Sequence, residues 1–182
     1  MQTDLQMNDQ TVPTGGDYDS DSIQWLEGIE HIRKRPSMYI GDIGPRGLHH
    51  LVYEVIDNSI DEAMAGFCKS IHVTLTTEGS VRISDDGRGI PVSMKEEYGM
   101  SALELCLTKP NAGGKFDRGS YKVSGGLHGI GVSAVNALSA WLKARVKRDG
   151  KIWTMAFERG VTTKPLEFVG DATTTGTSIE FL

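Results

Sequence analysis

Three polar side chains occupy one row of a segment that otherwise has the pattern of a buried helix. The stretch 47–65 carries apolar residues at spacings of three, four and seven, which predicts an amphipathic helix whose apolar side holds Leu48, Leu51, Val52, Val55, Ile56, Ala63 and Met64. Glu54, Asn58 and Asp61 stand at i, i+4 and i+7, so helical geometry places them in line. Carboxylates and an amide on a largely buried helix cost desolvation free energy unless a polar group faces them. The row therefore indicates either a functional site or a solvated helix face.

A second polar motif, S-D-D-G-R-G-I-P at 84–91, follows an alternating stretch that is typical of a half-buried strand. Its simplest interpretation is a tight turn. The functional interpretation is a carboxylate at the end of a strand, facing a cavity, with neighbouring glycines that let a flat ligand approach the backbone.

A third motif spans 112–131 and contains seven glycines and two lysines before a helical pattern begins. Glycine-rich backbone that leads into a helix N-terminus offers free N–H groups to a phosphate, although a flexible surface loop would have a similar composition. Residues 129–134 also match the dinucleotide fingerprint G-x-G-x-x-A. The acid that this fingerprint requires would be Asp149, but Asp149-Gly150 lies between two alternating runs and predicts a hairpin turn. A dinucleotide fold is therefore disfavoured.

The three motifs, with Gly176-Thr177 before a closing strand pattern, resemble the nucleotide-binding motifs of the ATPase superfamily that contains gyrase, Hsp90, histidine kinases and the MutL proteins. The spellings R-K-R-P-S-M-Y-I-G at 33–41 and S-Y-K-V-S-G-G-L-H-G-I-G-V at 120–132 are similar to the N-terminal ATPase domains of the bacterial DNA gyrase B family. The resemblance extends from about residue 18 to residue 182. The ATPase proteins of topoisomerase IV are the alternative, but they usually lack the paired histidines at 49–50.

The resemblance implies an ATP site and gives roles to its residues. Glu54 is expected to act as general base, with His50 orienting it, and Asn58 to bind Mg²⁺ through a neutral oxygen that suits a hard cation. Asp85 is expected to accept a hydrogen bond from the exocyclic amine of adenine, and Arg88 to pair with Glu62 at the rim of the pocket. The other residues expected to contact the nucleotide are Asp61, Gly89, Ile90, Pro91, Lys115, Tyr121, Lys122, Gly126, Leu127, His128, Gly129, Ile130, Gly131 and Thr177, with Val55, Ile83, Ile90 and Ile179 as apolar walls.

One segment departs from the family pattern. Where the family usually has an apolar residue, leucine and histidine, this chain has Lys109-Pro110-Asn111. Proline lacks an amide donor and disfavours helix in the residue before it, so a helix from Ser101 should end by about Thr108.

Composition and charge narrow the class of protein. The 182 residues suit one domain, and Cys68 and Cys106 fit no metal spacing, so we expect reduced core thiols of a cytoplasmic protein. The sequence shows no signal peptide and no long apolar span, so we expect a soluble protein without a membrane partner. Five aspartates and no basic residue fall within residues 1–21, which gives this segment a net charge of −5. The whole chain also has a net charge of −5, so the remaining residues carry a net charge of zero. A domain without net positive charge is poorly suited to bind the phosphates of DNA, so we expect the DNA contacts to lie in other domains of the parent protein.

The expected fold is a two-layer α/β sandwich of the Bergerat ATPase type, with a mixed, mostly antiparallel sheet and helices on one face. Helices are predicted near 23–33, 48–65, 100–108 and 132–139, and strands within 71–84, 141–158 and 177–181. The domain expectation is an acidic arm at 1–21, disordered in isolation, and an ATP-binding domain at 22–182 that is truncated at its C-terminal end.

The resemblance also implies partners. It predicts a self-dimer that forms on ATP binding, with the arm around Tyr18 reaching the other protomer, and the gyrase A protein as a partner in the full enzyme. A nucleotide-binding module without turnover and a kinase of the histidine-kinase type remain as alternatives. Glu54 favours hydrolysis over simple binding, and the spelling Y-K-V-S-G-G-L-H-G disfavours the kinase.

Overall fold

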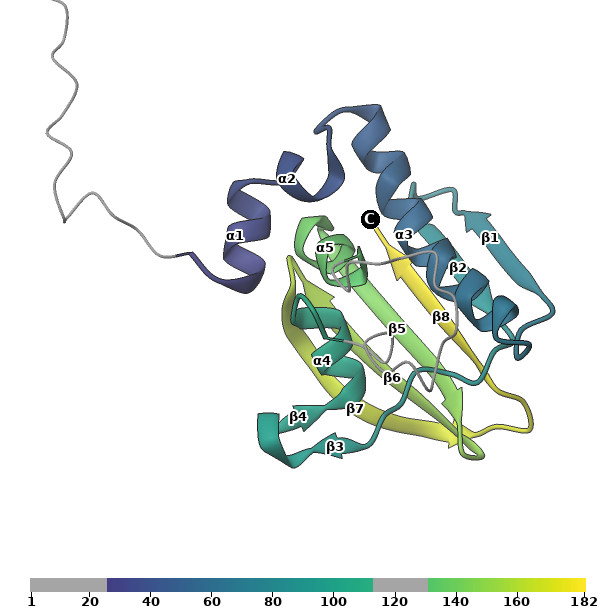
Figure 1. Cartoon of the computed structure of the whole chain (residues 1–182). Helices are drawn as coiled ribbons and strands as arrows, with labels where there is room; N and C mark the ends of the chain where they lie inside the picture. Colours follow the sequence, from purple (N-terminus) through teal and green to yellow (C-terminus); the bar gives the residue numbers. More distant parts are fainter. Residues whose placement is uncertain (1–25, 113–130) are drawn as a thin grey trace, which may run out of the picture.

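A six-stranded antiparallel sheet organises the chain, as shown by a computed structural model that describes residues 26–112 and 131–182 (Figure 1). The strand order is β1-β2-β8-β5-β6-β7, and each neighbouring pair is antiparallel. The strands are β1 (Ile71–Leu75), β2 (Val81–Asp85), β5 (Trp141–Arg148), β6 (Lys151–Glu158), β7 (Val161–Asp171) and β8 (Gly176–Phe181). The acidic arm expected at 1–21 lies outside the described residues.

Helices cover one face of this sheet (Figure 1). The long helix is α3 (Pro45–Met64), and it is joined by α4 (Ala102–Thr108) and α5 (Gly131–Leu138). Two short helices, α1 (Gly28–Lys34) and α2 (Ser37–Ile40), precede α3, and a small hairpin of β3 (Met94–Lys95) and β4 (Met100–Ser101) encloses the 3₁₀ turn Glu96–Tyr98. The expected two-layer α/β sandwich is confirmed.

The core fills the space between the sheet and the helices. Along β5, Leu142, Ala144 and Val146 are buried while Lys143 and Arg145 are exposed, which is the two-residue alternation of a strand with one covered face. The buried residues that form the main cluster are Leu51, Val55, Ile83, Leu103, Leu107, Val135, Leu142, Ala144, Val146, Met155, Phe157, Ile179 and Phe181.

Local signals in the sequence explain several boundaries. Helix α4 ends at Thr108, as Pro110 predicts, and begins with the Ser101 side chain accepting a hydrogen bond from the Glu104 amide at 3.1 Å. The predicted hairpin turn between β5 and β6 is present, with positive φ at Asp149 and Gly150. No helix within 26–112 and 131–182 combines the length and apolar character of a membrane span.

Other expectations differ from the structure. The first helix was predicted near 23–33, but it begins at Gly28, and residues 26 and 27 are not helical. Leu48 and Met64, expected on the apolar side of α3, are 63% and 55% exposed. The buried row of α3 runs along every fourth residue from Gly47 through Ser59, and these two side chains lie beside it.

Candidate nucleotide site

Helix α3 brings the predicted catalytic side chains together. It starts after Gly44, which has an extended backbone conformation, and it carries proline in its first turn, where the missing amide donor costs nothing. The His50 Nε2 atom lies 3.1 Å from Glu54 Oε1, one helical turn later. The Asn58 Nδ2 atom donates to the Glu54 carbonyl oxygen at 3.1 Å, so Oδ1 is the end of this amide that remains to accept or to bind a cation.

The carboxylate of Glu54 lies against the beginning of α5. A Cβ atom added to Gly131, the first residue of α5, would overlap Glu54 Oε2 and lie 2.9 Å from Glu54 Cδ. The first backbone N–H groups of a helix lack intrahelical acceptors and carry the positive end of the helix dipole. Glu54 is thus placed at the helix end where the sequence predicts that phosphate binds.

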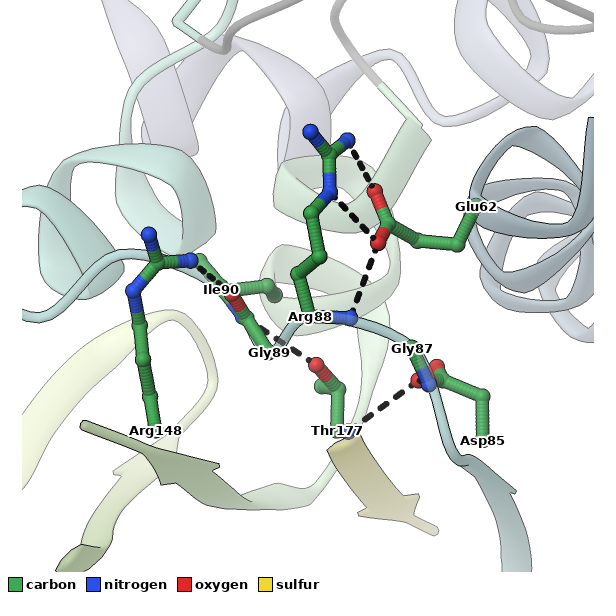
Figure 2. A network of polar contacts seen from close by, with 8 residues as sticks. All are labelled: Glu62, Asp85, Gly87, Arg88, Gly89, Ile90, Arg148 and Thr177. Atoms are coloured by element: carbon green, nitrogen blue, oxygen red, sulfur yellow. Dashed lines mark hydrogen bonds and ion pairs between the residues drawn. The ribbon is translucent and has the colours of Figure 1, made fainter. Parts of the chain in front are cut away.

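The second part of the site is centred on Asp85, at the end of β2. Asp85 Oδ1 accepts hydrogen bonds from the amides of Gly87 at 3.0 Å and Thr177 at 3.2 Å (Figure 2). Asp85 Oδ2 accepts from Ser59 Oγ, on α3, at 2.8 Å. Burial raises the pKa of Asp85, and the three hydrogen bonds oppose that rise because they favour the ionised form.

The loop after β2 is tied to α3 by a charged pair. Arg88 donates through Nε to Glu62 Oε2 at 3.0 Å and through a terminal nitrogen to Oε1 at 2.7 Å, and its backbone amide donates to Oε2 at 3.0 Å (Figure 2). The Arg88 guanidinium also lies 4.0 Å from the centre of the Phe67 ring. The predicted pair is therefore present, and its two parallel bonds give it a fixed geometry.

Further contacts hold the loop on the β8 side. Gly89 has a φ of +79°, and a Cβ there would lie 2.6 Å from the Lys147 carbonyl oxygen, so glycine is required. The Ile90 amide donates to Thr177 Oγ1 at 3.2 Å, and an Arg148 terminal nitrogen donates to the Gly89 carbonyl oxygen at 2.5 Å (Figure 2). Sequence reasoning missed Arg148, because only its place before the Asp149-Gly150 turn marks it and no spacing links it to the loop.

Apolar side chains lie beneath these polar groups. Val55 on α3, Ile83 on β2 and Ile179 on β8 are at most 3% exposed and belong to the main core cluster, and Ile90 packs against that cluster. These are the residues expected as apolar walls.

The structure places most of the predicted residues that it describes on neighbouring elements. Asp61 is 1% exposed and lies on α3 between Ser59 and Glu62, which contact Asp85 and Arg88 respectively, while Pro91 is exposed at the end of the loop. Eight of the residues predicted to contact the nucleotide lie outside the described part of the chain: Lys115, Tyr121, Lys122, Gly126, Leu127, His128, Gly129 and Ile130.

Two chemical centres result, joined by one helix. Ser59 follows Glu54 by five residues, or about 7.5 Å along the helix axis at 1.5 Å per residue. One end offers a half-buried acceptor next to the apolar core, and the other offers a carboxylate, a histidine and a helix N-terminus. A ligand that joins them would have a flat base with a hydrogen-bond donor at one end and an anionic group at the other.

Comparison with known proteins identifies this arrangement. A family model described as histidine kinase-, DNA gyrase B- and HSP90-like ATPase matches residues 43–181. The chain belongs to this ATPase family. The match includes α3, the Asp85 loop and β8, so every described residue of the candidate site falls within it.

Individual members of the family resemble the chain closely. It is 56% identical over 165 residues to the DNA gyrase B protein of Borreliella burgdorferi, covering 91% of this chain and 26% of that protein. It is 57% identical over 164 residues to the DNA gyrase B protein of Thermotoga maritima, covering 90% and 26%. The crystal structure of the 43K ATPase domain of Thermus thermophilus gyrase B, in complex with an aminocoumarin, superposes with a TM-score of 0.74 at 43% identity, covering 86% of this chain and 39% of that one.

The expected resemblance to the ATPase domain of gyrase B is therefore confirmed within the ATPase family. The chain spans about a quarter of the length of these two curated relatives. ATP binding follows from membership of the ATPase family. Family membership does not by itself assign a role to each side chain of the site.

Proposed function

We propose that this chain binds ATP with Mg²⁺ and hydrolyses the terminal phosphoanhydride bond, with Glu54 as the general base. The contact that carries this proposal is the 3.1 Å approach of His50 Nε2 to Glu54 Oε1, beside the first residue of α5. A base must lie within hydrogen-bond reach of the attacking water, and a partner that fixes its orientation is part of such an arrangement. His50 is the positioning residue for Glu54 in this proposal.

The remaining roles are those that the family resemblance implies, and the same geometry supports them. Asp85 accepts from the exocyclic amine of adenine, and Asp61, Gly89 and Thr177 complete the base pocket. Asn58 binds Mg²⁺ through Oδ1, since Nδ2 is engaged by the Glu54 carbonyl, and Mg²⁺ when bound neutralises charge on the phosphates. Gly131, together with the predicted residues between 115 and 130, would bind the phosphate chain through amides and lysines.

We further propose that the intact protein is a type II topoisomerase of the DNA gyrase B type. The relatives named above support this, because they carry that name and are identical to this chain at more than half of the positions in the matched region. In this proposal ATP closes a dimer through the N-terminal arm, the gyrase A protein completes the cytoplasmic enzyme, and other domains hold the DNA that is supercoiled. The ATPase domain at 22–182 would then supply the energy of strand passage.

Replacing Glu54 with Gln tests the catalytic assignment in the intact protein. The amide keeps the shape of the side chain but cannot take a proton, so turnover should fall by several orders of magnitude while nucleotide affinity stays within a few-fold. Steady-state hydrolysis and calorimetry with a non-hydrolysable ATP analogue give the two quantities. Glu158→Gln, at an exposed position on β6, is the matched control. Hydrolysis by the Glu54→Gln protein at the rate of this control would contradict the assignment of Glu54 as general base, whereas nucleotide binding without hydrolysis by the unchanged protein would favour a nucleotide-binding role for the site.

A further inference from the structure

Ser59 makes a buried contact that none of the roles above uses. It lies on α3, one residue after Asn58, and is 2% exposed. A serine inside a helix commonly returns its hydroxyl to the carbonyl oxygen of the preceding turn. Here the hydroxyl instead crosses to β2 and donates to Asp85 Oδ2 at 2.8 Å. The contact links the helix that carries Glu54 directly to the carboxylate proposed to recognise the base.

The hydrogen bonds of Asp85 give this contact a defined consequence. A carboxylate has about four acceptor positions on its two oxygens. Oδ1 receives the amides of Gly87 and Thr177, and Oδ2 receives Ser59, so the position that remains belongs to Oδ2. The terminal torsion of an aspartate is broad and does not fix the carboxylate plane by itself. The two amides fix one oxygen, and Ser59 fixes the other.

From this geometry we propose that Ser59 is a positioning residue for adenine recognition, holding Asp85 Oδ2 at the orientation in which it accepts the exocyclic amine of the base. The inference rests on the proposed role of Asp85. Ser59 acts through Asp85 and needs no contact with the nucleotide. The same hydroxyl favours the charged carboxylate, which is the better acceptor, in a place where burial disfavours charge.

A structural role for Ser59 makes different predictions from a positioning role. If the hydroxyl only joins α3 to β2, its removal lowers the stability of the fold and leaves base selectivity and its pH dependence unchanged. If it orients and ionises Asp85, its removal weakens ATP binding more than GTP binding. It also raises the pKa of Asp85, so the loss of ATP binding on acidification begins at a higher pH.

The test compares Ser59→Ala with Ser84→Ala in the 182-residue chain. Ser84 lies beside Asp85 on β2 and bonds Ser178 Oγ at 2.7 Å, so this control loses a hydroxyl contact of similar length that does not involve Asp85. Calorimetry with a non-hydrolysable ATP analogue and with the matching GTP analogue is repeated from neutral pH downwards. For Ser59→Ala we expect the ATP analogue to bind about tenfold more weakly and its binding to be lost on acidification at a higher pH than in the unchanged chain. For Ser84→Ala we expect both the affinity and its pH dependence to match those of the unchanged chain.

Two outcomes overturn the inference, and a further variant separates it from the proposed function. The inference is contradicted if Ser59→Ala and Ser84→Ala have the same affinities and the same pH dependence. It is also contradicted if Ser59→Ala binds more weakly but keeps the same preference for the ATP analogue and loses binding at the same pH. Asp85→Asn is measured alongside: if it binds both analogues like the unchanged chain, the assignment of Asp85 itself fails. If Ser59→Ala does not fold, Ser59→Cys keeps the shape with a much weaker donor and must show the same two shifts.

Discussion

Two adjacent aspartates at the end of β2 show how closely environment controls the chemistry of a residue. Asp85 is turned toward α3 and β8, where burial raises its pKa. Asp86 is turned to solvent and accepts the amides of Lys69 and Ser70 through Oδ1 at 2.7 and 2.9 Å. Those two bonds lower the pKa of Asp86 to about 2. The sequence D-D-G-R-G marks both residues equally, and only the fold assigns one to the site and the other to the loop before β1.

Asp86 should therefore contribute to stability in a pH-dependent way. Its pKa is depressed in the folded protein relative to the ordinary value of 3.8, so its contribution is present above that value and is lost as pH falls toward about 2. We predict that Asp86→Asn lowers the free energy of unfolding at neutral pH, and that the difference from the unchanged chain shrinks below about pH 4. Denaturant unfolding across this range measures the difference. A difference that is independent of pH down to the acid limit of folding would contradict the assignment.

At the scale of elements, the approach of α5 to α3 sets the position of the proposed base. Gly131 is the first residue of α5, and its missing side chain leaves the space that the Glu54 carboxylate occupies. The sequence predicted Gly131 as a phosphate contact through its amide, and the contact with Glu54 adds a second reason for glycine there. The atom that a Cβ would displace is the end of a flexible side chain, so the fold can adjust while the carboxylate moves.

We predict that Gly131→Ala lowers ATP turnover by about 10²-fold in the intact protein, since a shift of about 1 Å in a catalytic group can cost that much. Nucleotide affinity should stay within a few-fold, because alanine keeps the amide N–H. Gly44→Ala is the control: its Cβ would meet nothing closer than 3.4 Å, and its φ is negative. Steady-state hydrolysis and nucleotide binding by both variants are compared. Turnover by Gly131→Ala equal to that of Gly44→Ala would contradict this account of the α3–α5 contact.

Elements with a regular pattern could be predicted, and the others could not. Helix α3 and the β5–β6 hairpin have apolar periodicity and a turn signal, so their type and approximate bounds followed from the sequence. Strand β7 was missed because it is an edge strand that contains Pro165 and pairs with β6 through three irregularities in register, so alternation is lost. Most of its residues are exposed, which removes the hydrophobic signal as well.

At the scale of the whole molecule, the site depends on contacts between segments far apart in the chain. Ser59 reaches Asp85 across 26 residues, Ile90 reaches Thr177 across 87, and Arg148 reaches Gly89 across 59. The motifs indicated that Asp85 and Thr177 share a pocket only through the family resemblance. Spacing alone could not give these pairs, because they depend on which strands are neighbours in the sheet and on the packing of α3 against it.

The assembled sheet also explains why adenine is the proposed base. One strand end supplies Asp85 as a half-buried acceptor, and β8 and α3 supply the groups that fix it. A base that presents an acceptor at this position would leave the remaining acceptor position on Asp85 Oδ2 without a donor, which costs about 1–3 kcal/mol when a polar group is desolvated without a partner. In this proposal, selectivity for the nucleotide is a property of the whole arrangement of α3, β2 and β8.

Calorimetry on the 182-residue chain with Mg²⁺ and non-hydrolysable analogues of ATP and GTP tests this account most directly. The structure predicts binding of the ATP analogue and at least about tenfold weaker binding of the GTP analogue, with most of that preference lost in Asp85→Asn. Equal affinity of the unchanged chain for the two analogues would contradict the assignment of Asp85, and with it the central claim that α3, β2 and β8 form an adenine-nucleotide site.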